Sequence, residues 1–327
     1  MSLPTMWWTF SSIRSLFLDR TVAAALEPII TGAYVELNDL LALRYRRPGN
    51  ADPTARVMGN QAGIRVSKLR GRGIDFSEVR AYQPGDDVRT IDWRVTARKN
   101  KTHTKVFREE RERLTLLVVD QTQSMFFGSQ IRLKSVAAAE AAALCAWQAL
   151  AHNDRVGGMV IGNTEHIIHK PYRNVKSVAR LLGDLTRQNR SLKRCAAYQS
   201  LPHLIEALAQ LRRLARRNYR ICFISDFEPM GDHWRDAFRD LGRRNEVIAL
   251  RIFDPLEREL PPADSYTVTD GTERWQFHAG NSRLRSQYRQ RFDDHQDRFV
   301  KVCEQTMATY QFVPTNEALA MHRGWFL

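Results

Sequence analysis

The chain has 327 residues, of which 43% are hydrophobic and 26% charged, close to the average for a soluble globular protein. This composition excludes a disordered chain, a collagen, a coiled coil and a disulfide miniprotein, and the length suits about two domains. Fifty Lys and Arg residues against 36 Asp and Glu residues give a formal net charge of +14. Such a charge favours an anionic partner, such as nucleic acid, an acidic lipid surface or an acidic protein face.

The cysteines and the apolar stretches indicate a cellular compartment. The four cysteines form no CxxC pair, which argues against a zinc knuckle or a disulfide framework. Cys145 and Cys222 fall in apolar runs, where buried thiols are expected, and this suits a reducing compartment. No apolar stretch reaches the roughly 20 residues that span a bilayer, and the N-terminus lacks the features of a signal peptide. We therefore expect a soluble, cytoplasmic protein.

Residues 1–45 are predicted to form an N-terminal helical segment. Over residues 21–45 the pattern predicts a helix interrupted at Pro28. Nearer the start, apolar residues recur at helical spacing beside Arg14 and Arg20: Trp7, Phe10, Ile13 and Phe17. Such a helix packs on its own domain, which is the favoured interpretation, or lies on an anionic membrane surface and makes the protein peripheral there.

Residues 46–113 form a second segment, in which glycine and proline separate short, highly charged stretches. This texture predicts short strands and ordered loops. Opposite charges alternate around a tryptophan in one block: Arg80, Asp86, Asp87, Arg89, Asp92, Trp93 and Arg98. We expect bidentate Arg–carboxylate pairs to lock this block onto the following domain, with Trp93 as the apolar anchor. The alternative is a docking surface for a partner.

Residues 114–327 are predicted to form an α/β domain with a doubly wound, mostly parallel sheet. Three apolar runs indicate strands buried on both faces: Leu114–Val119, Tyr219–Ser225 and Glu246–Phe253. Helices are expected at 131–151, 175–188, 201–217, 234–241 and 282–310, and further short strands at 155–161, 165–169, 266–269 and 311–314. This alternation is typical of α/β domains, whose sites form beyond the carboxyl ends of the strands.

An aspartate directly follows each of two predicted strands. Asp120 ends the first apolar run and Asp226 the second, and Thr122 and Ser124 follow Asp120 at alternate positions. These side chains offer carboxylate and hydroxyl oxygens to one point, a ligand set that suits Mg²⁺ or Mn²⁺ and leaves room for an outside carboxylate. The alternative is that Asp120 and Thr122 only cap the following helix and satisfy loop amides.

Other candidate sites are weaker. His166 and His169 stand three apart, which on a strand places them on opposite faces, so a shared metal is not expected. No Walker loop occurs, and Ser124 has no His and Asp partners at the spacing of a hydrolase triad.

The Asp120, Thr122, Ser124 and Asp226 set resembles the metal-ion-dependent adhesion site of von Willebrand factor A domains. That family's usual first motif is D-x-S-x-S, and Thr122 retains the hydroxyl of the serine it replaces. The family's third loop usually offers a threonine just before a helix. In the corresponding stretch of this chain Ser200 is the nearest hydroxyl, so the resemblance implies Ser200 as the candidate third-loop ligand.

The block GRGIDFSEVRAYQPGDDVRTIDWRVTAR at residues 71–98 resembles the signature of the domain-of-unknown-function 58 family. Those proteins are von Willebrand A-like and are commonly encoded beside MoxR-type AAA+ ATPases. The resemblance covers roughly residues 40–327. It implies a von Willebrand A-like fold for the last domain, and a MoxR-type ATPase and an unknown client protein as partners.

The leading hypothesis is a non-enzymatic, metal-dependent interaction module, acting as an adaptor with the ATPase in folding, assembly or activation of the client. One alternative is a Mg²⁺-dependent phosphohydrolase of haloacid-dehalogenase type. Such enzymes usually carry D-x-D, and Thr122 cannot serve as the general acid. The other alternative, a basic nucleic-acid-binding protein, rests on the net charge alone. The sequence contains no recognition-helix motif and no array of aromatic and basic residues for stacking on bases, so no specific nucleic acid is expected.

Overall fold

The computed structural model describes residues 30–45, 74–99, 101–109, 112–192, 201–269 and 274–319. The chain divides into two compact units. One unit joins residues 1–60 to residues 113–327 and contains the α/β domain, and the other comprises residues 61–112.

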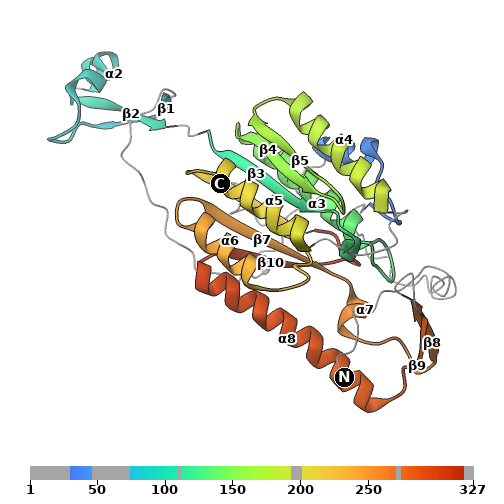
Figure 1. Ribbon diagram of the computed structural model, residues 1–327. Coiled ribbons are helices and arrows are strands. Elements are labelled where there is room, and N and C mark those ends of the chain that lie inside the picture. The colour runs from blue at the N-terminus through green and yellow to red at the C-terminus, as the bar shows by residue number, and fades with distance from the viewer. Residues whose placement is uncertain are drawn as a thin grey trace. The chain divides into compact units, whose positions relative to one another are not determined.

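A six-stranded sheet forms the centre of the larger unit (Figure 1). The strand order is β10-β7-β6-β3-β4-β5, and only β5 runs antiparallel to its neighbour. This arrangement confirms the predicted doubly wound, mostly parallel sheet. The strands are β3 (Leu114–Asp120), β4 (Arg155–Ile161), β5 (His166–Tyr172), β6 (Tyr219–Ser225), β7 (Glu246–Phe253) and β10 (Thr309–Pro314).

Successive residues of a strand point to opposite faces of the sheet. Because the central strands carry apolar residues at successive positions, both faces are apolar and both are covered by helices. Leu117 and Val119 face one apolar cluster, and Leu116 and Val118 face the other. The first cluster is closed by α3 (Lys134–Ala151) and α4 (Val175–Ser191). The second is closed by α5 (Leu201–Leu214), α6 (Asp232–Gly242) and α8 (Ser282–Thr306).

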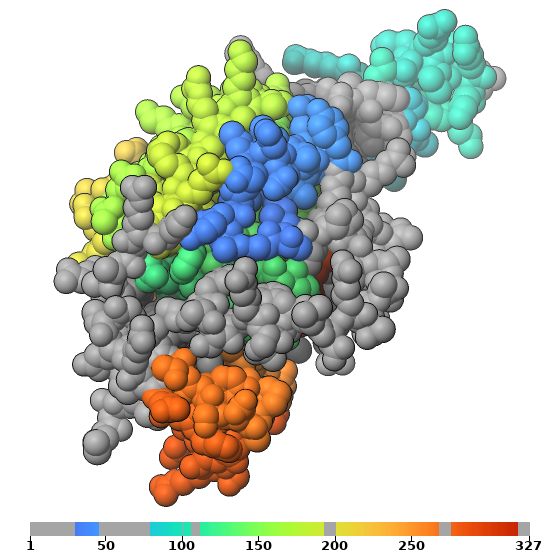
Figure 2. Space-filling view, turned by 90° about the vertical axis from the view of Figure 1, so that its right-hand side faces the viewer, coloured from blue at the N-terminus to red at the C-terminus, as the bar shows by residue number. Residues whose placement is uncertain are grey.

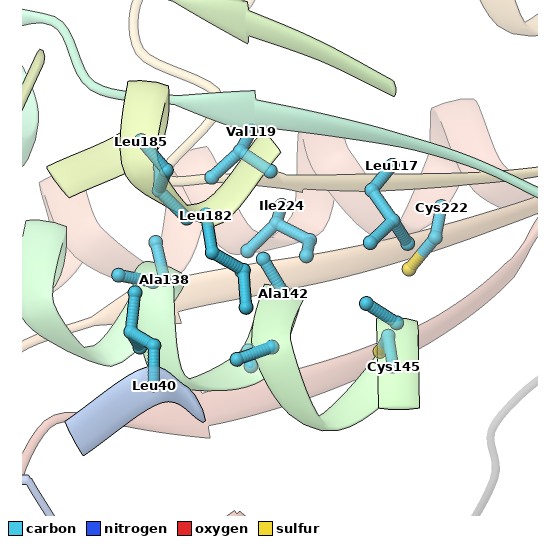
Figure 3. Packing of buried hydrophobic residues seen from close by; sticks show 14 of the residues in the cluster. Leu40, Leu117, Val119, Ala138, Ala142, Cys145, Leu182, Leu185, Cys222 and Ile224 are labelled. Atoms are coloured by element: carbon cyan, nitrogen blue, oxygen red, sulfur yellow. The ribbon is translucent and has the colours of Figure 1, made fainter. Parts of the chain in front are cut away.

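The first cluster shows how the sequence of α3 determines its packing (Figure 3). Ala138 and Ala142 present only methyl groups, so the helix approaches the strands closely. Cys145 of α3 and Cys222 of β6 are both fully buried there, as expected for their apolar runs.

The N-terminal part of the larger unit differs from the predicted helix over residues 21–45. Within the described residues the helix begins only at Leu37, with α1 (Leu37–Ala42) and the 3₁₀ turn η2 (Leu43–Tyr45). Ahead of it, Gly32 has a φ of +101°, which favours glycine and interrupts a helix. Figure 2 shows this segment in blue, against the green surface of the domain. The predicted aromatic helix of Trp7 to Phe17 lies outside the described residues.

Arg132, just before α3, links a segment before α1 to a segment after β10. Its guanidinium forms a fully buried ion pair with Glu140, whose carboxylate also accepts the Ile30 backbone N–H at 3.2 Å. The same guanidinium donates to the carbonyls of Thr315 at 3.1 Å and Glu317 at 2.8 Å. One buried cation thus joins the segment before α1, the helix α3 and the segment after β10.

The smaller unit is a hairpin of β1 (Ile74–Ala81) and β2 (His103–Glu109). The 3₁₀ turn η3 (Val88–Thr90) and the helix α2 (Trp93–Lys99) lie between the two strands in the chain. The short strands agree with the sequence, whereas α2 was not predicted.

A second hairpin, in the larger unit, pairs β8 (Ser265–Thr269) with β9 (Arg274–His278). The predicted strand at 266–269 therefore belongs to a separate two-stranded sheet, and its partner β9 was not predicted. A short helix, α7 (Pro255–Arg258), follows β7. Among the residues that the structure describes, no helix is both long and apolar enough to cross a membrane.

Candidate metal centre

The two predicted aspartates lie at the same edge of the sheet, because β3 and β6 are adjacent and parallel. Asp120 is 3% exposed and Asp226 is 4% exposed. One oxygen of Asp120, Oδ1, accepts the Thr122 backbone N–H at 2.9 Å, and the other accepts the Ser225 hydroxyl at 2.6 Å. Buried carboxylates of this kind require such donors to remain stable.

Two hydroxyl groups connect the aspartates. Thr122 Oγ1 lies 3.1 Å from Ser124 Oγ, and Ser124 Oγ donates to Asp226 Oδ1 at 3.2 Å. Both side chains are buried, in the loop that contains the 3₁₀ turn η4 (Gln123–Met125). The structure therefore brings Asp120, Thr122, Ser124 and Asp226 into one continuous group of oxygens, which we call the oxygen cluster. Ser200, the fifth predicted ligand, lies outside the described residues.

A lysine that the sequence analysis missed completes the surroundings of the oxygen cluster. Lys134 is the first residue of α3, and its Nζ lies 2.7 Å from Asp226 Oδ2 and 2.6 Å from Glu257 Oε1 of α7. Its side chain is 3% exposed. A lysine at a helix start gives no sequence signal for this role, because its partners follow 92 and 123 residues later in the chain.

The two aspartates differ in their electrostatic environment. Burial, with repulsion from Asp226 added, raises the pKa of Asp120 to about 6. Burial also acts to raise the pKa of Asp226, but the Lys134 ammonium outweighs it and lowers that pKa below the usual range. The same carboxylates, Asp226 and Glu257, outweigh burial at Lys134 and raise its pKa. One carboxylate of the oxygen cluster thus has a counter-ion in direct contact, whereas the other has only dipolar partners.

The donor set fits a small hard cation. Two carboxylates and two hydroxyls are ligands of the kind that Mg²⁺ and Mn²⁺ prefer. The buried cations Lys134 and Arg251 interact with three carboxylates, those of Asp226, Glu228 and Glu257. The fourth carboxylate, Asp120, adjoins Asp226 and has no cation among its described partners. The acids outnumber the bases, and Asp120 is the carboxylate that a further cation would stabilise most.

The loop of the oxygen cluster is fixed to the neighbouring turn of the sheet. The Gln123 backbone N–H donates to Asn163 Oδ1 at 2.7 Å, and Asn163 lies in the turn between β4 and β5. This contact ties the loop to the β4–β5 turn. Thr122 and Ser124 are therefore positioned by backbone contacts as well as by each other.

The charged block of the smaller unit forms local pairs. Arg80 contacts Asp86 at 2.7 Å, and Asp87 accepts the Arg89 backbone N–H at 3.0 Å as the N-cap of η3. Among the described residues, no arginine pairs with Asp92. Its carboxylate accepts the N–H groups of Arg94 and Val95, and its ion-pair partner is Lys105 at 3.6 Å.

The expected apolar anchor of that block is open to solvent. Trp93 is 69% exposed, and Arg98 is exposed in the last turn of α2, where a cation suits the helix dipole. Attachment of the block to the α/β unit through Arg–Asp pairs stays a prediction. Local turns and caps account for its aspartates, which is why alternating charges alone did not identify their partners.

Comparison with known proteins gives the chain a family and distant structural neighbours. Residues 78–298 match the family described as "Protein of unknown function DUF58". An uncharacterized protein of Mycobacterium tuberculosis is 32% identical over 214 residues, which cover 64% of this chain and 64% of that protein. Among solved structures, BatB from Bacteroides thetaiotaomicron is 14% identical with a TM-score of 0.39, covering 62% of this chain and 90% of BatB. The VWA domain of SpRpn10 is 10% identical with a TM-score of 0.32, covering 64% of this chain and 92% of that domain.

Proposed function

The chain belongs to the DUF58 family, and we propose that it is a non-enzymatic interaction module that docks partners through a divalent metal held by the oxygen cluster. Mg²⁺ or Mn²⁺ would be bound by Asp120, Thr122 and Ser124, with Asp226 contributing directly or through water. A carboxylate from a partner protein would take an exchangeable position on the metal.

The observation that supports this proposal is the continuity of the oxygen cluster. Asp120 accepts the Thr122 backbone N–H at 2.9 Å, the Thr122 and Ser124 hydroxyl oxygens are 3.1 Å apart, and the Ser124 hydroxyl donates to Asp226 at 3.2 Å. The alternative, that Asp120 and Thr122 only cap a helix and satisfy loop amides, accounts for part of these contacts. The backbone N–H of Thr122 satisfies one oxygen of Asp120, but the Thr122 side chain caps no backbone group of η4.

A binding role also suits the chemistry better than hydrolysis. The Ser124 hydroxyl contacts Thr122 and Asp226, so its contacts provide no imidazole base. Thr122 occupies the position where a phosphohydrolase of the haloacid-dehalogenase type needs its general acid. A hydroxyl at that position can bind a metal but cannot titrate in the required range.

We further propose that the partner is a MoxR-type AAA+ ATPase, with which this chain assists the folding, assembly or activation of a client protein. The resemblance of residues 71–98 to the family signature supports this association. The exposed Trp93, together with Val88 at 62% exposure, offers a second partner surface on the smaller unit.

Metal binding is tested first by calorimetry with Mg²⁺ and Mn²⁺ on the full chain after EDTA treatment. Thr122→Ala removes a ligand oxygen. It should weaken metal binding by at least the roughly 10–100-fold that is lost when a residue supporting a ligand is removed. Thr122→Ser keeps the hydroxyl and is the matched control, expected to bind like the unchanged chain. Equal affinity for all three proteins would contradict the proposed ligand set.

Partner docking is tested by binding of the purified MoxR-type ATPase from the same organism. EDTA should abolish binding, excess Mg²⁺ should restore it, and Thr122→Ala should bind more weakly than Thr122→Ser. Binding that ignores EDTA but falls steeply with salt would instead indicate contacts to polyanions, such as nucleic acid.

A further inference from the structure

Two histidines from distant parts of the chain meet at the edge of the main sheet. His166 is the first residue of β5, and His203 lies in the first turn of α5. His166 Nδ1 is 3.4 Å from His203 Nε2, and the ring centroids are 4.9 Å apart with the planes tilted by 41°. Both side chains are partly buried.

This separation suits a metal ion better than a hydrogen bond. An N–H donor normally lies about 2.7–3.2 Å from its acceptor, so 3.4 Å is long for a bond between two rings. Two imidazole nitrogens bound at about 2.0–2.1 Å to one tetrahedral zinc ion are about 3.3–3.4 Å apart. We propose that His166 and His203 form a two-histidine site for a zinc-class transition-metal ion.

The ligand type separates this site from the oxygen cluster. Imidazole nitrogen suits Zn²⁺, Ni²⁺ and Cu²⁺, whereas Mg²⁺ prefers oxygen. Among the described residues, no group of three or more His, Cys, Asp or Glu side chains is placed to hold a metal. Within the described part of the chain, the remaining coordination positions of a metal on this pair would be filled by water or by a ligand from a binding partner.

The other histidine of β5 explains why the sequence did not reveal the pair. His169 contacts Asp184 of α4 at 2.9 Å, as expected for the face opposite to His166. The metal partner of His166 is contributed by α5, 37 residues further along the chain. The spacing within β5 could exclude a pair with His169 but could not identify His203.

The register of the sheet places this site beside the oxygen cluster. Asp120 pairs with Ile161 of β4, and Ile161 pairs with His166 of β5. His166 is thus two strand spacings from Asp120 at the same edge, about 10 Å between backbones. Asn163, three residues before His166, holds the loop of the oxygen cluster through Gln123. A partner that docks at this edge would meet both sites, although the histidine site does not depend on metal at the oxygen cluster.

Calorimetry with ZnCl₂ tests the site, using the full chain after EDTA treatment and with Mg²⁺ in excess. Loss of a residue that only supports a metal ligand costs roughly 10–100-fold in metal affinity. His166→Gln and His203→Gln each remove a ligand itself, so each should lower zinc affinity by at least that much. His152→Gln, at the exposed end of α3, is the matched control and should bind like the unchanged chain. Asp120→Asn should also retain zinc, which separates this site from the oxygen cluster. Unchanged zinc affinity in both His166→Gln and His203→Gln would overturn the proposal.

X-ray absorption of the zinc-loaded, unchanged chain gives a measurement that does not depend on how the variants fold. The expected spectrum shows two imidazole nitrogens at about 2.0–2.1 Å from zinc, with oxygen in the other positions. A coordination shell with fewer than two imidazoles would refute the site.

Discussion

Two lysine–aspartate pairs, one in each unit, contain the same chemical groups in different environments. Lys134 and Asp226 are 2.7 Å apart, with side chains 3% and 6% exposed. Lys105 and Asp92 are 3.6 Å apart, with side chains 42% and 16% exposed. The first pair lies beside the oxygen cluster, where the sheet and α3 exclude water. The second lies on a hairpin, where water solvates the ammonium.

The difference shows that burial, not the presence of opposite charges, determines what a pair contributes. Removing one partner of a buried pair leaves an uncompensated charge, whereas an exposed charge regains its hydration. Alternating charges in a sequence therefore predict little until burial is known. Each of the following experiments tests this contrast.

The largest effect is expected from Lys134→Met. Asp226 and Glu257 would lose the ammonium that they share, at a cost of about 3–5 kcal/mol in the free energy of unfolding. Urea denaturation measures this change, and Lys105→Met is the matched control, expected to change stability little. Similar losses in the two variants would show that burial does not separate the two pairs.

The second effect is a pH dependence that comes from Asp120. Its pKa is raised to about 6 in the folded protein against an ordinary value of 3.8, so the folded state binds the proton more tightly than the unfolded state. Stability contributed by Asp120 should therefore fall as pH rises from about 4 to 6, by roughly 3 kcal/mol in EDTA, and stay level above.

Denaturation of the unchanged chain and of Asp120→Asn across this range isolates that contribution. The difference between the two proteins should vary with pH in EDTA and should flatten in excess Mg²⁺, because a bound cation stabilises the carboxylate. A difference that is constant with pH in EDTA would mean that Asp120 titrates normally.

A smaller loss is expected from Glu140→Gln, at the fully buried ion pair with Arg132. The amide oxygen can still accept a hydrogen bond, and Arg132 keeps the carbonyls of Thr315 and Glu317, so we expect about 1–3 kcal/mol. The control is Glu36→Gln, whose exposed pair with Arg190 should contribute close to nothing. Thermal unfolding of both variants makes the comparison, and an equal shift in the two would contradict it.

The smallest effect is expected from Asp92→Ala. The sequence analysis expected Asp92 to pair with an arginine, but its ion-pair partner is Lys105, whose side chain is 42% exposed. The change therefore mainly removes an acceptor from backbone N–H groups in the first turn of α2. Circular dichroism of the full chain should show an almost unchanged melting curve. A large loss of stability would show that the block is held by contacts beyond its own hairpin.

The fold was largely predictable because each central strand corresponds to one largely apolar run of residues in the sequence. The predicted ranges Tyr219–Ser225 and Glu246–Phe253 coincide with β6 and β7, since buried parallel strands require unbroken apolar sequence. The ends of helices were less predictable. The helix expected to reach Tyr310 ends at Thr306, where Met307 takes a left-handed φ of 57° and β10 begins shortly after.

The residues of the oxygen cluster were predictable for a related reason. Asp120 and Asp226 each end such a run, so sheet topology alone could place them together. Lys134 and His203 were not predictable, because their contacts depend on how α3 and α5 are rotated and docked. The hydrophobic periodicity of a segment does not indicate how its helix docks on the rest of the fold.

The buried guanidinium of Arg132 has a mechanical consequence. The segments before α1 and after β10 are fastened to this one side chain, through Ile30 by way of Glu140 and through Thr315 directly. Tension applied to either segment would therefore reach the start of α3 as well as the sheet, because Thr315 also bonds to Phe253 of β7. Lys134 lies two residues beyond Arg132, so part of such a load would be transmitted toward the ammonium that balances Asp226.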